Sequence, residues 1–225
     1  MFTTGFTAQQ RYGADYAIAG KDGVHPDWAG HLVMAYAFLK AMGLDGDLGT
    51  FTVDLASGKA TASAGHQVDR FADGALTITS SRYPFCATGS PDRDNSIRSA
   101  MTLVPFNAEL NRLKLVVKGG AAANYAVTWG GETRTYSAAQ LAAGVNLADD
   151  FVTNPFSAAF ARVDAAVADK QKYETRQIKE LFHGPEGKAD ADATAALTEK
   201  VRQPLADAIA TAFVPVTHTI RIEPK

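Results

Sequence analysis

The chain has 225 residues, of which 46% are hydrophobic, and its formal net charge is −2. This length and composition can support a large buried core, and lysines and arginines spread along the chain offer no basic stripe to nucleic acid or anionic lipid. The single cysteine, Cys86, excludes an internal disulfide and a cysteine-rich metal site.

We therefore expect no nucleic-acid partner. The sequence has no apolar run of about 18 residues, so we also expect no membrane span. Its first residues lack the pattern of a signal peptide, and the sequence leaves the localisation open.

The first predicted elements are a strand, a loop and a helix. The apolar run 15–19 ends in Gly20 and predicts a buried strand that delivers the following loop at its carboxyl end, where active sites of open α/β sheets lie. We expect a helix over 26–42, with Pro26 at its first position, because proline has its φ angle preset for that place. Apolar residues at helical spacing form one stripe of this helix: Trp28, Leu32, Ala35, Leu39 and Met42. Such a stripe indicates that the helix packs on a sheet.

The middle of the chain has the alternating pattern of β-strands. The candidate strands are 50–55, 59–63, 75–79, 112–117, 125–129 and 132–136. Short turns that contain glycine join the first pair and the last pair, which predicts two hairpins. We therefore expect a small antiparallel β unit.

The rest of the chain is mainly helical. We expect short helical turns within 137–151, a long helix from Pro155 to Gly184 and a second helix over 192–213. Residues 216–222 alternate again and could return as a strand to the β unit. The expected domains are 1–46, 47–136 with the returning strand 216–222, and 137–215.

Asp22 and His25 form the candidate catalytic site. A carboxylate three residues before a histidine, across the turn at Gly23, can fold back onto one ring nitrogen and leave the other free to take a proton from a nucleophile. His31 lies on a different side of the predicted helix and is expected to pack rather than to react. The other histidines lack metal-ligand spacing and are expected at the surface: His66, His183 and His218. We assign no metal and no cofactor to the chain.

The string Asp-Gly-Val-His-Pro-Asp-Trp-Ala-Gly-His, from Asp22 to His31, resembles the last conserved block of the SGNH hydrolases, also called GDSL esterases and lipases. The resemblance covers residues 14–43, and the tail from residue 47 resembles extended members of planctomycete type more loosely. It implies that 1–46 is the C-terminal strand and helix of a flavodoxin-like α/β/α domain. It also implies a serine ester hydrolase whose Ser-His-Asp triad includes Asp22 and His25, with small-molecule or acetylated carbohydrate esters as substrates.

The nucleophile of that family is missing from this sequence. Its Gly-Asp-Ser block, and the glycine and asparagine blocks of its oxyanion hole, do not occur. We therefore expect the chain to be the C-terminal part of a longer enzyme, inactive alone, with an upstream SGNH segment or a complementary fragment as its partner. Without that partner, the apolar helix stripe and the strand edge would be exposed and would cause self-association.

Two other interpretations stay open. In the first, residues 47–225 form a non-catalytic carbohydrate-binding or interaction module, and 1–46 has no catalytic duty. In the second, the enzyme is split between two chains, and this half supplies the base. Glycan binding without esterase activity, even with the upstream half restored, would favour the first.

Overall fold

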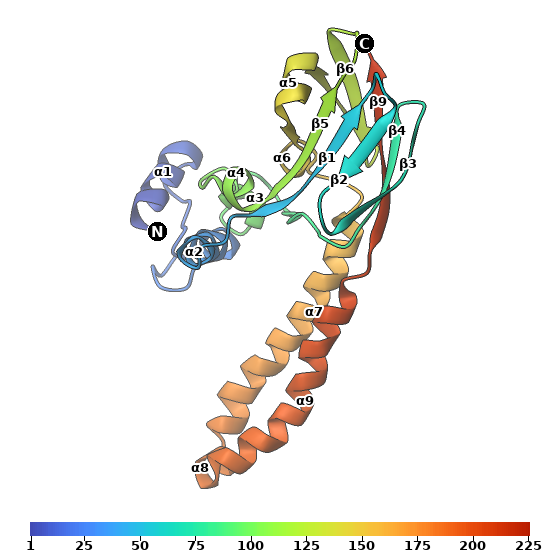
Figure 1. Cartoon of the computed structure of the whole chain (residues 1–225). Helices are drawn as coiled ribbons and strands as arrows, with labels where there is room; N and C mark the ends of the chain where they lie inside the picture. Colours follow the sequence, from blue (N-terminus) through green and yellow to red (C-terminus); the bar gives the residue numbers. More distant parts are fainter. The chain divides into compact units, whose positions relative to one another are not determined.

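The computed structural model describes the whole chain, residues 1–225. Nine α-helices, one π-helix and nine strands in two sheets make a mixed α/β fold, as the sequence predicts. Figure 1 shows the path of the chain through these elements. The chain divides into two compact units, one of Met1–Asn154 with Thr217–Lys225 and the other of Pro155–Val216. The three domains expected from the sequence stay a prediction.

Four helices of the first unit share one core. They are α1 (Phe2–Tyr12), α2 (Trp28–Ala41), α3 (Ile97–Ala100) and α4 (Phe106–Leu110). Their buried apolar residues, with two from the turns after α1, form a single cluster: Ala8, Tyr16, Ile18, Ala29, Leu32, Val33, Ala100, Phe106 and Leu110. The beginning of the chain is therefore packed on a segment that is distant in sequence, and of these helices only α2 was predicted.

Residues 15–19 do not form the predicted strand, and this expectation was wrong. Tyr16 is buried, but the backbone around it follows turns. The amide of Ala17 donates to the carboxylate of Asp94, and the amide of Gly20 donates to the carbonyl of Ala17. No strand of either sheet lies beside this segment, so a side chain and a turn satisfy its backbone groups instead.

The helix α2 starts at Trp28, two residues later than predicted. Asp27 is its N-cap, and the Asp27 side chain accepts a hydrogen bond from the amide of Trp28 at 3.1 Å. Pro26 therefore precedes the helix instead of opening it. The buried face of α2 consists of Ala29, Gly30, Leu32 and Val33.

The opposite face of α2 is apolar and exposed. Trp28, Phe38 and Met42 are 57%, 63% and 66% exposed, and we call these three residues the apolar face. Of the stripe predicted to be buried, only Leu32 is fully buried and Leu39 is partly so. Because both sides of α2 carry apolar residues, their spacing alone could not identify the buried side.

The first sheet has the strand order β2-β1-β5-β8. Its strands are β1 (Asp47–Asp54), β2 (Lys59–Ala62), β5 (Arg112–Lys118) and β8 (Val145–Asn146). β1 and β2 form the predicted hairpin, but β1 and β5 pair in parallel, with Phe51 opposite Leu115. The sheet is therefore mixed rather than antiparallel. The short helices α5 (Ala138–Ala143) and α6 (Leu147–Asp150) pack against β5.

The second sheet has the strand order β3-β4-β9-β6-β7. Its strands are β3 (His66–Ala72), β4 (Ala75–Ser80), β6 (Asn124–Trp129), β7 (Glu132–Ser137) and β9 (Val216–Pro224). β9 is the predicted returning strand; it lies between β4 and β6 and pairs antiparallel with β6, with Ile220 opposite Trp129. The ring of Phe51 in the first sheet lies 5.7 Å from the ring of His218 in β9, so the two sheets share a core.

The second unit is a pair of antiparallel helices. α7 (Ser157–Arg176) continues as the π-helix Gln177–Phe182, and α8 (Pro185–Ala189) and α9 (Ala191–Ala212) follow. α7 and α9 lie side by side, which agrees with the predicted helical pair (Figure 1). Between them, the Tyr173 hydroxyl donates to the carbonyl of Thr198, and the Gln177 amide donates to the Thr198 hydroxyl. No helix of the chain is both long enough and apolar enough to cross a membrane.

Candidate functional site

The structure brings Asp22 and His25 together in the loop before α2. Nδ1 of His25 lies 2.6 Å from Oδ2 of Asp22, and the side chains of His25 and Asp22 are 85% and 56% exposed. Because an ionised carboxylate only accepts, Nδ1 carries the hydrogen, and Nε2 of the neutral ring keeps its lone pair. The ring makes no other hydrogen bond within the chain. The pair thus has the geometry of a base and the acid that orients it.

Asp22 also accepts two backbone hydrogen bonds. The amides of Val24 and His25 donate to its Oδ1 at 3.0 and 2.9 Å. The hydrogen bond from the His25 ring, followed by these two amides, holds the pKa of the Asp22 carboxyl well below its ordinary value. Asp22 is therefore ionised near neutral pH, with one oxygen fixed by the backbone and the other facing the imidazole.

Two glycines allow the backbone around this pair to approach closely. Gly20 has a φ of +82°, and a Cβ atom there would lie 1.9 Å from the carbonyl oxygen of His25. Gly30 lies on α2, where a Cβ atom would lie 2.0 Å from the carbonyl oxygen of Ile18 and 2.6 Å from Cβ of Pro26. Backbone atoms cannot move away cheaply from such contacts, so both positions require glycine.

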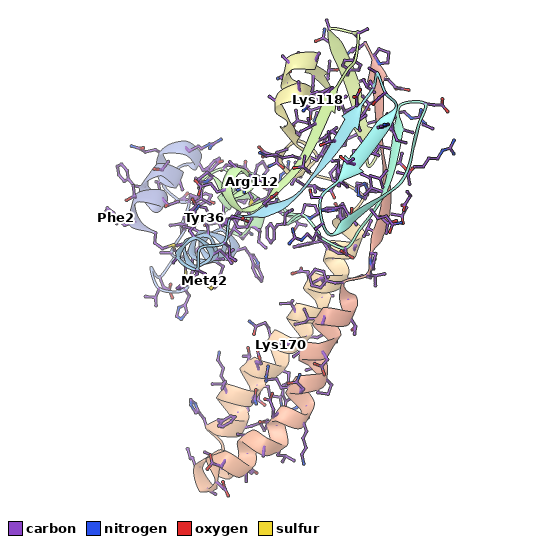
Figure 2. All side chains as sticks on the ribbon, in the orientation of Figure 1. Phe2, Tyr36, Met42, Arg112, Lys118 and Lys170 are labelled. Carbon is purple, nitrogen blue, oxygen red and sulfur yellow. The ribbon has the colours of Figure 1, made fainter.

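A groove of about 620 Å³ lies between α1 and the turns that precede Asp22. Its lining includes Phe2, Phe6, Ile18 and Gly23, and Phe2 is 90% exposed. Figure 2 labels Phe2 at the start of α1. Gly23 belongs to the turn that joins Asp22 to His25, so a molecule bound in this groove would contact that turn. His31, in contrast, is exposed on α2 beside the ring of Trp28, at 6.3 Å between ring centres.

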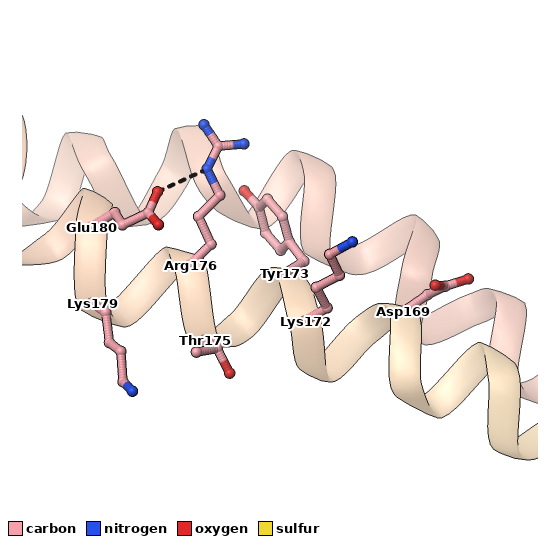
Figure 3. A pocket seen from close by; sticks show the side chains of 7 residues that line it. All are labelled: Asp169, Lys172, Tyr173, Thr175, Arg176, Lys179 and Glu180. Carbon is pink, nitrogen blue, oxygen red and sulfur yellow. Dashed lines mark hydrogen bonds and ion pairs between the residues drawn. The ribbon is translucent and has the colours of Figure 1, made fainter.

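A second pocket, of about 400 Å³, lies on the helical pair (Figure 3). Charged side chains from successive turns of α7 and the π-helix surround it, and Nε of Arg176 pairs with a carboxylate oxygen of Glu180 at 3.2 Å. Its lining consists of Asp169, Lys172, Tyr173, Thr175, Arg176, Lys179 and Glu180. Tyr173 is partly buried and the other six residues are exposed, with Arg176 and Glu180 joined in their ion pair. The lining contains no pairing of a base with a nucleophile.

A network of hydrogen-bonded side chains, which no sequence pattern predicts, lies between the two sheets. His218 is 4% exposed and His66 is partly buried, although both were expected at the surface, so that expectation was wrong. Nε1 of Trp129 donates to Nδ1 of His218 at 3.1 Å, and Nε2 of His218 lies 3.0 Å from Oγ of Ser80. The same Oγ lies 2.8 Å from Nδ1 of His66, whose Nε2 lies 2.8 Å from the carbonyl oxygen of Leu48.

This chain of hydrogen bonds is satisfied when both histidines are neutral. The carbonyl of Leu48 can only accept, so His66 carries its hydrogen on Nε2, Ser80 donates to His66, and His218 donates to Ser80. Burial lowers the pKa of His66; burial, and then the charge of His66, lowers the pKa of His218 to about 4. Because Ser80 is fully buried, this network of hydrogen bonds is part of the core and not a substrate site.

One sequence signal could have revealed His218. In the alternating segment 216–222 it shares its side of the strand with Ile220 and Ile222, both of which are buried. Side chains two residues apart on a strand point to the same face. The alternation that predicted the strand thus also placed His218 inside.

Comparison with known proteins gives one informative similarity. No family model matches the sequence, and no curated protein matches it. A solved structure described as BT4096, a gut microbial diltiazem-metabolizing enzyme, is similar with a TM-score of 0.68 and 20% sequence identity. The match covers 100% of this chain and 60% of that chain, so this chain spans less than two thirds of its structural neighbour. At this identity the similarity shows a common fold.

Proposed function

We propose that Asp22 and His25 are the orienting acid and the general base of a serine ester hydrolase of SGNH/GDSL type, and that polypeptide outside these 225 residues supplies the serine. The observation that carries the proposal is the 2.6 Å contact between Nδ1 of His25 and Asp22, which leaves Nε2 exposed to an incoming group. The fold shared with a diltiazem-metabolizing enzyme supports an enzymatic role.

In the proposed reaction, His25 acts in both halves of ester hydrolysis. Nε2 of His25 takes the proton of the serine hydroxyl as its oxygen attacks the ester carbonyl, and Asp22 stabilises the imidazolium that forms. The imidazolium then returns this proton to the leaving alcohol, which departs and leaves an acyl-serine. In the second half, His25 deprotonates a water that attacks the acyl carbon. The bond between the acyl carbon and the serine oxygen then breaks, His25 returns the proton to that oxygen, and the carboxylic acid leaves.

The exposed apolar residues support a further layer of polypeptide against α2. Trp28, Phe38 and Met42 would each gain about 1.5–3 kcal/mol if a partner buried them. On a soluble monomer, a large contiguous apolar patch commonly marks an interaction site. We propose that the segment that brings the serine also covers the apolar face. Acetylated carbohydrate is the substrate class that the resemblance implies.

The test is to restore a serine-containing segment and to ask whether His25 is needed. The chain is expressed together with the polypeptide encoded upstream of it, and hydrolysis of 4-nitrophenyl acetate is followed with and without His25→Ala. We expect activity only when the upstream segment is present and a loss of several orders of magnitude in the variant. Full activity in His25→Ala would refute the assignment. Glycan binding without hydrolysis would favour a non-catalytic module.

A further inference from the structure

One residue, Asp94, holds both ends of the loop that carries Asp22 and His25. We call residues 17–29 the dyad loop. Its first amide, that of Ala17, donates to Oδ2 of Asp94 at 3.0 Å, and its last amide, that of Ala29, donates to the carbonyl oxygen of Asp94 at 3.0 Å. Asp94 thus joins two points of the backbone that lie on either side of the dyad.

Both amides need an acceptor that the loop does not provide. Ala29 lies in the first turn of α2, where amides have no partner within the helix, and the side chain of Asp27 accepts from Trp28 only. Ala17 lies where the sequence predicted a strand, but no neighbouring strand is present. A bond from an amide to an ionised carboxylate is stronger than one between neutral groups, so the Ala17 contact is the stronger of the two.

The segment around Asp94 is itself fixed in the core. The Ser99 hydroxyl, which is fully buried, donates to the carbonyl of Arg93 at 2.6 Å. The hydroxyl of Tyr16, the residue before Ala17, lies 2.6 Å from the same Ser99 oxygen and donates to it. Asp94 therefore holds the loop from a segment that is anchored beside Tyr16.

We propose that Asp94 is a positioning residue for the Asp22–His25 dyad. The inference rests on the proposed function for its catalytic meaning, but its structural part stands alone. The dyad is exposed, and the hydrogen bonds of Asp22 lie within its own turn, so they do not fix that turn relative to α2. Asp94 fixes this turn relative to α2, because it binds the backbone at Ala17, directly after Tyr16, and at Ala29, in the first turn of the helix. Small misplacements of a catalytic base reduce the rate strongly, so this tether matters for chemistry.

The experiment compares two substitutions that differ in one property. Asp94→Asn keeps a side-chain oxygen that can accept the hydrogen bond, whereas Asp94→Ala removes it. Asp92→Ala is the control, because Asp92 is exposed and accepts a hydrogen bond only from Ser90. The first readout is amide hydrogen exchange of Ala17, and the second is the tautomer of His25 from the nitrogen shifts of its ring. Asp94→Ala should increase exchange at Ala17 at least about tenfold, because this amide loses its charged acceptor. It should also raise the Nε2–H tautomer, because a loop released at Ala17 holds Asp22 less firmly against the ring of His25.

A third readout separates positioning from substrate binding. In the ester-hydrolysing enzyme, Asp94→Ala should lower kcat by about 10–100-fold with KM changed less than about twofold, and Asp94→Asn should restore most of the rate. Unchanged exchange and an unchanged tautomer in Asp94→Ala would overturn the proposal. If His25→Ala leaves hydrolysis intact while Asp94→Ala still shifts the tautomer, the proposed function fails and the positioning role stands.

Loss of folding in Asp94→Ala would not end the test. Asp94→Glu keeps the charge but displaces the oxygens by one methylene, so it can be compared with Asp94→Asn. We expect Asp94→Asn to resemble the unaltered chain and Asp94→Glu to show faster exchange at Ala17 and a shifted His25 tautomer. Equal behaviour of these two variants would contradict a role that depends on the position of the acceptor.

Discussion

The two sheets and the N-terminal helices of the first unit differ in how completely their apolar residues are buried. Between the sheets, Phe51 and Trp129 have no exposed surface. On α2, one face is buried while Trp28 and Phe38 on the other are 57% and 63% exposed. Two sheets that face each other bury their apolar sides between them. A helix with two apolar faces buries both only when polypeptide packs on each side. If the chain binds further polypeptide, as proposed, we therefore expect it to bind at α2 rather than at the sheets.

Histidine placement follows the same division. His218 is buried between the sheets, and hydrogen bonds occupy both of its ring nitrogens. His25 is exposed before α2, and Asp22 occupies one nitrogen only. A histidine with two satisfied nitrogens in a core stabilises the fold, whereas one with an open nitrogen can exchange a proton with a substrate. The catalytic role proposed for His25 therefore requires the less completely buried region.

The largest effect should come from the exposed pair. In the enzyme that contains the serine, Asp22→Asn removes the charge that sets the tautomer of His25, and turnover should fall about 10⁴-fold, as in related triads. Steady-state hydrolysis of 4-nitrophenyl acetate measures this loss. Asp92→Asn, an exposed carboxylate away from the pair, should leave turnover unchanged. If both variants behave alike, the open nitrogen of His25 has no catalytic role.

A matched pair of aromatic truncations tests the difference in burial. Trp129→Ala should reduce the free energy of unfolding by about 3–5 kcal/mol, because it leaves a cavity and removes the donor to His218. Phe38→Ala on the apolar face should change it by less than about 0.5 kcal/mol. Urea unfolding of the chain alone measures both. A cost above about 2 kcal/mol for Phe38→Ala would show that this face is already covered in solution.

Acid should weaken the sheet region through His218. Its pKa of about 4 in the folded chain lies below its ordinary value of 6.5, so the folded state binds fewer protons than the unfolded state between these values. This contribution is complete above about pH 6.5 and is lost as the pH falls toward about 4, a decrease on the order of 3 kcal/mol. Urea unfolding at a series of pH values measures the slope.

His218→Gln should flatten this pH dependence, since a glutamine does not titrate and its amide can still bond to Ser80 and Trp129. The control is His183→Gln, because His183 is exposed and its replacement should leave the slope unchanged. A slope that persists in His218→Gln would assign the acid sensitivity to other groups, with His66 the first to examine.

The last prediction concerns the backbone contact under the dyad loop. Gly30→Ala places a Cβ atom 2.0 Å from the carbonyl of Ile18 and should cost about 1–3 kcal/mol. Gly5→Ala is the comparison, because its Cβ atom would meet side-chain atoms of the same Ile18, with Cγ2 at 2.8 Å, and no backbone atom. We expect its cost to be the smaller of the two. Thermal unfolding should separate the two variants. Equal melting temperatures would show that the backbone at Ile18 moves to accommodate the new Cβ atom.

The sequence predicted the elements whose pattern is local. The hairpins, the returning strand and the helical pair follow from alternation, helical spacing and turn residues, and the spacing of Asp22 and His25 identified a pair that the structure brings into contact. The catalytic meaning of that pair stays a prediction. The parallel pairing of β1 with β5 could not be predicted from the sequence, because side chains alternate between the two faces in parallel and antiparallel strands alike.

Contacts between distant segments were the least predictable. The run 15–19 has buried side chains but no neighbouring strand, and the partner of its backbone, Asp94, is far away in sequence. The glycine at position 30 is required by the carbonyl of Ile18, which only the folded loop brings close. These contacts form only in the tertiary structure, and the sequence near each residue carries no pattern that predicts its distant partner.

During synthesis on the ribosome, the second sheet cannot be completed until β9 has been made. Its other strands emerge as two hairpins, β3–β4 and β6–β7, and the whole helical pair must be made before residues 217–224 can join them. Until then, β4 and β6 each present an unpaired edge, which is a template for wrong pairing in a nascent chain. The sheet therefore closes late, and its assembly in the cell should benefit from chaperones that shield such edges.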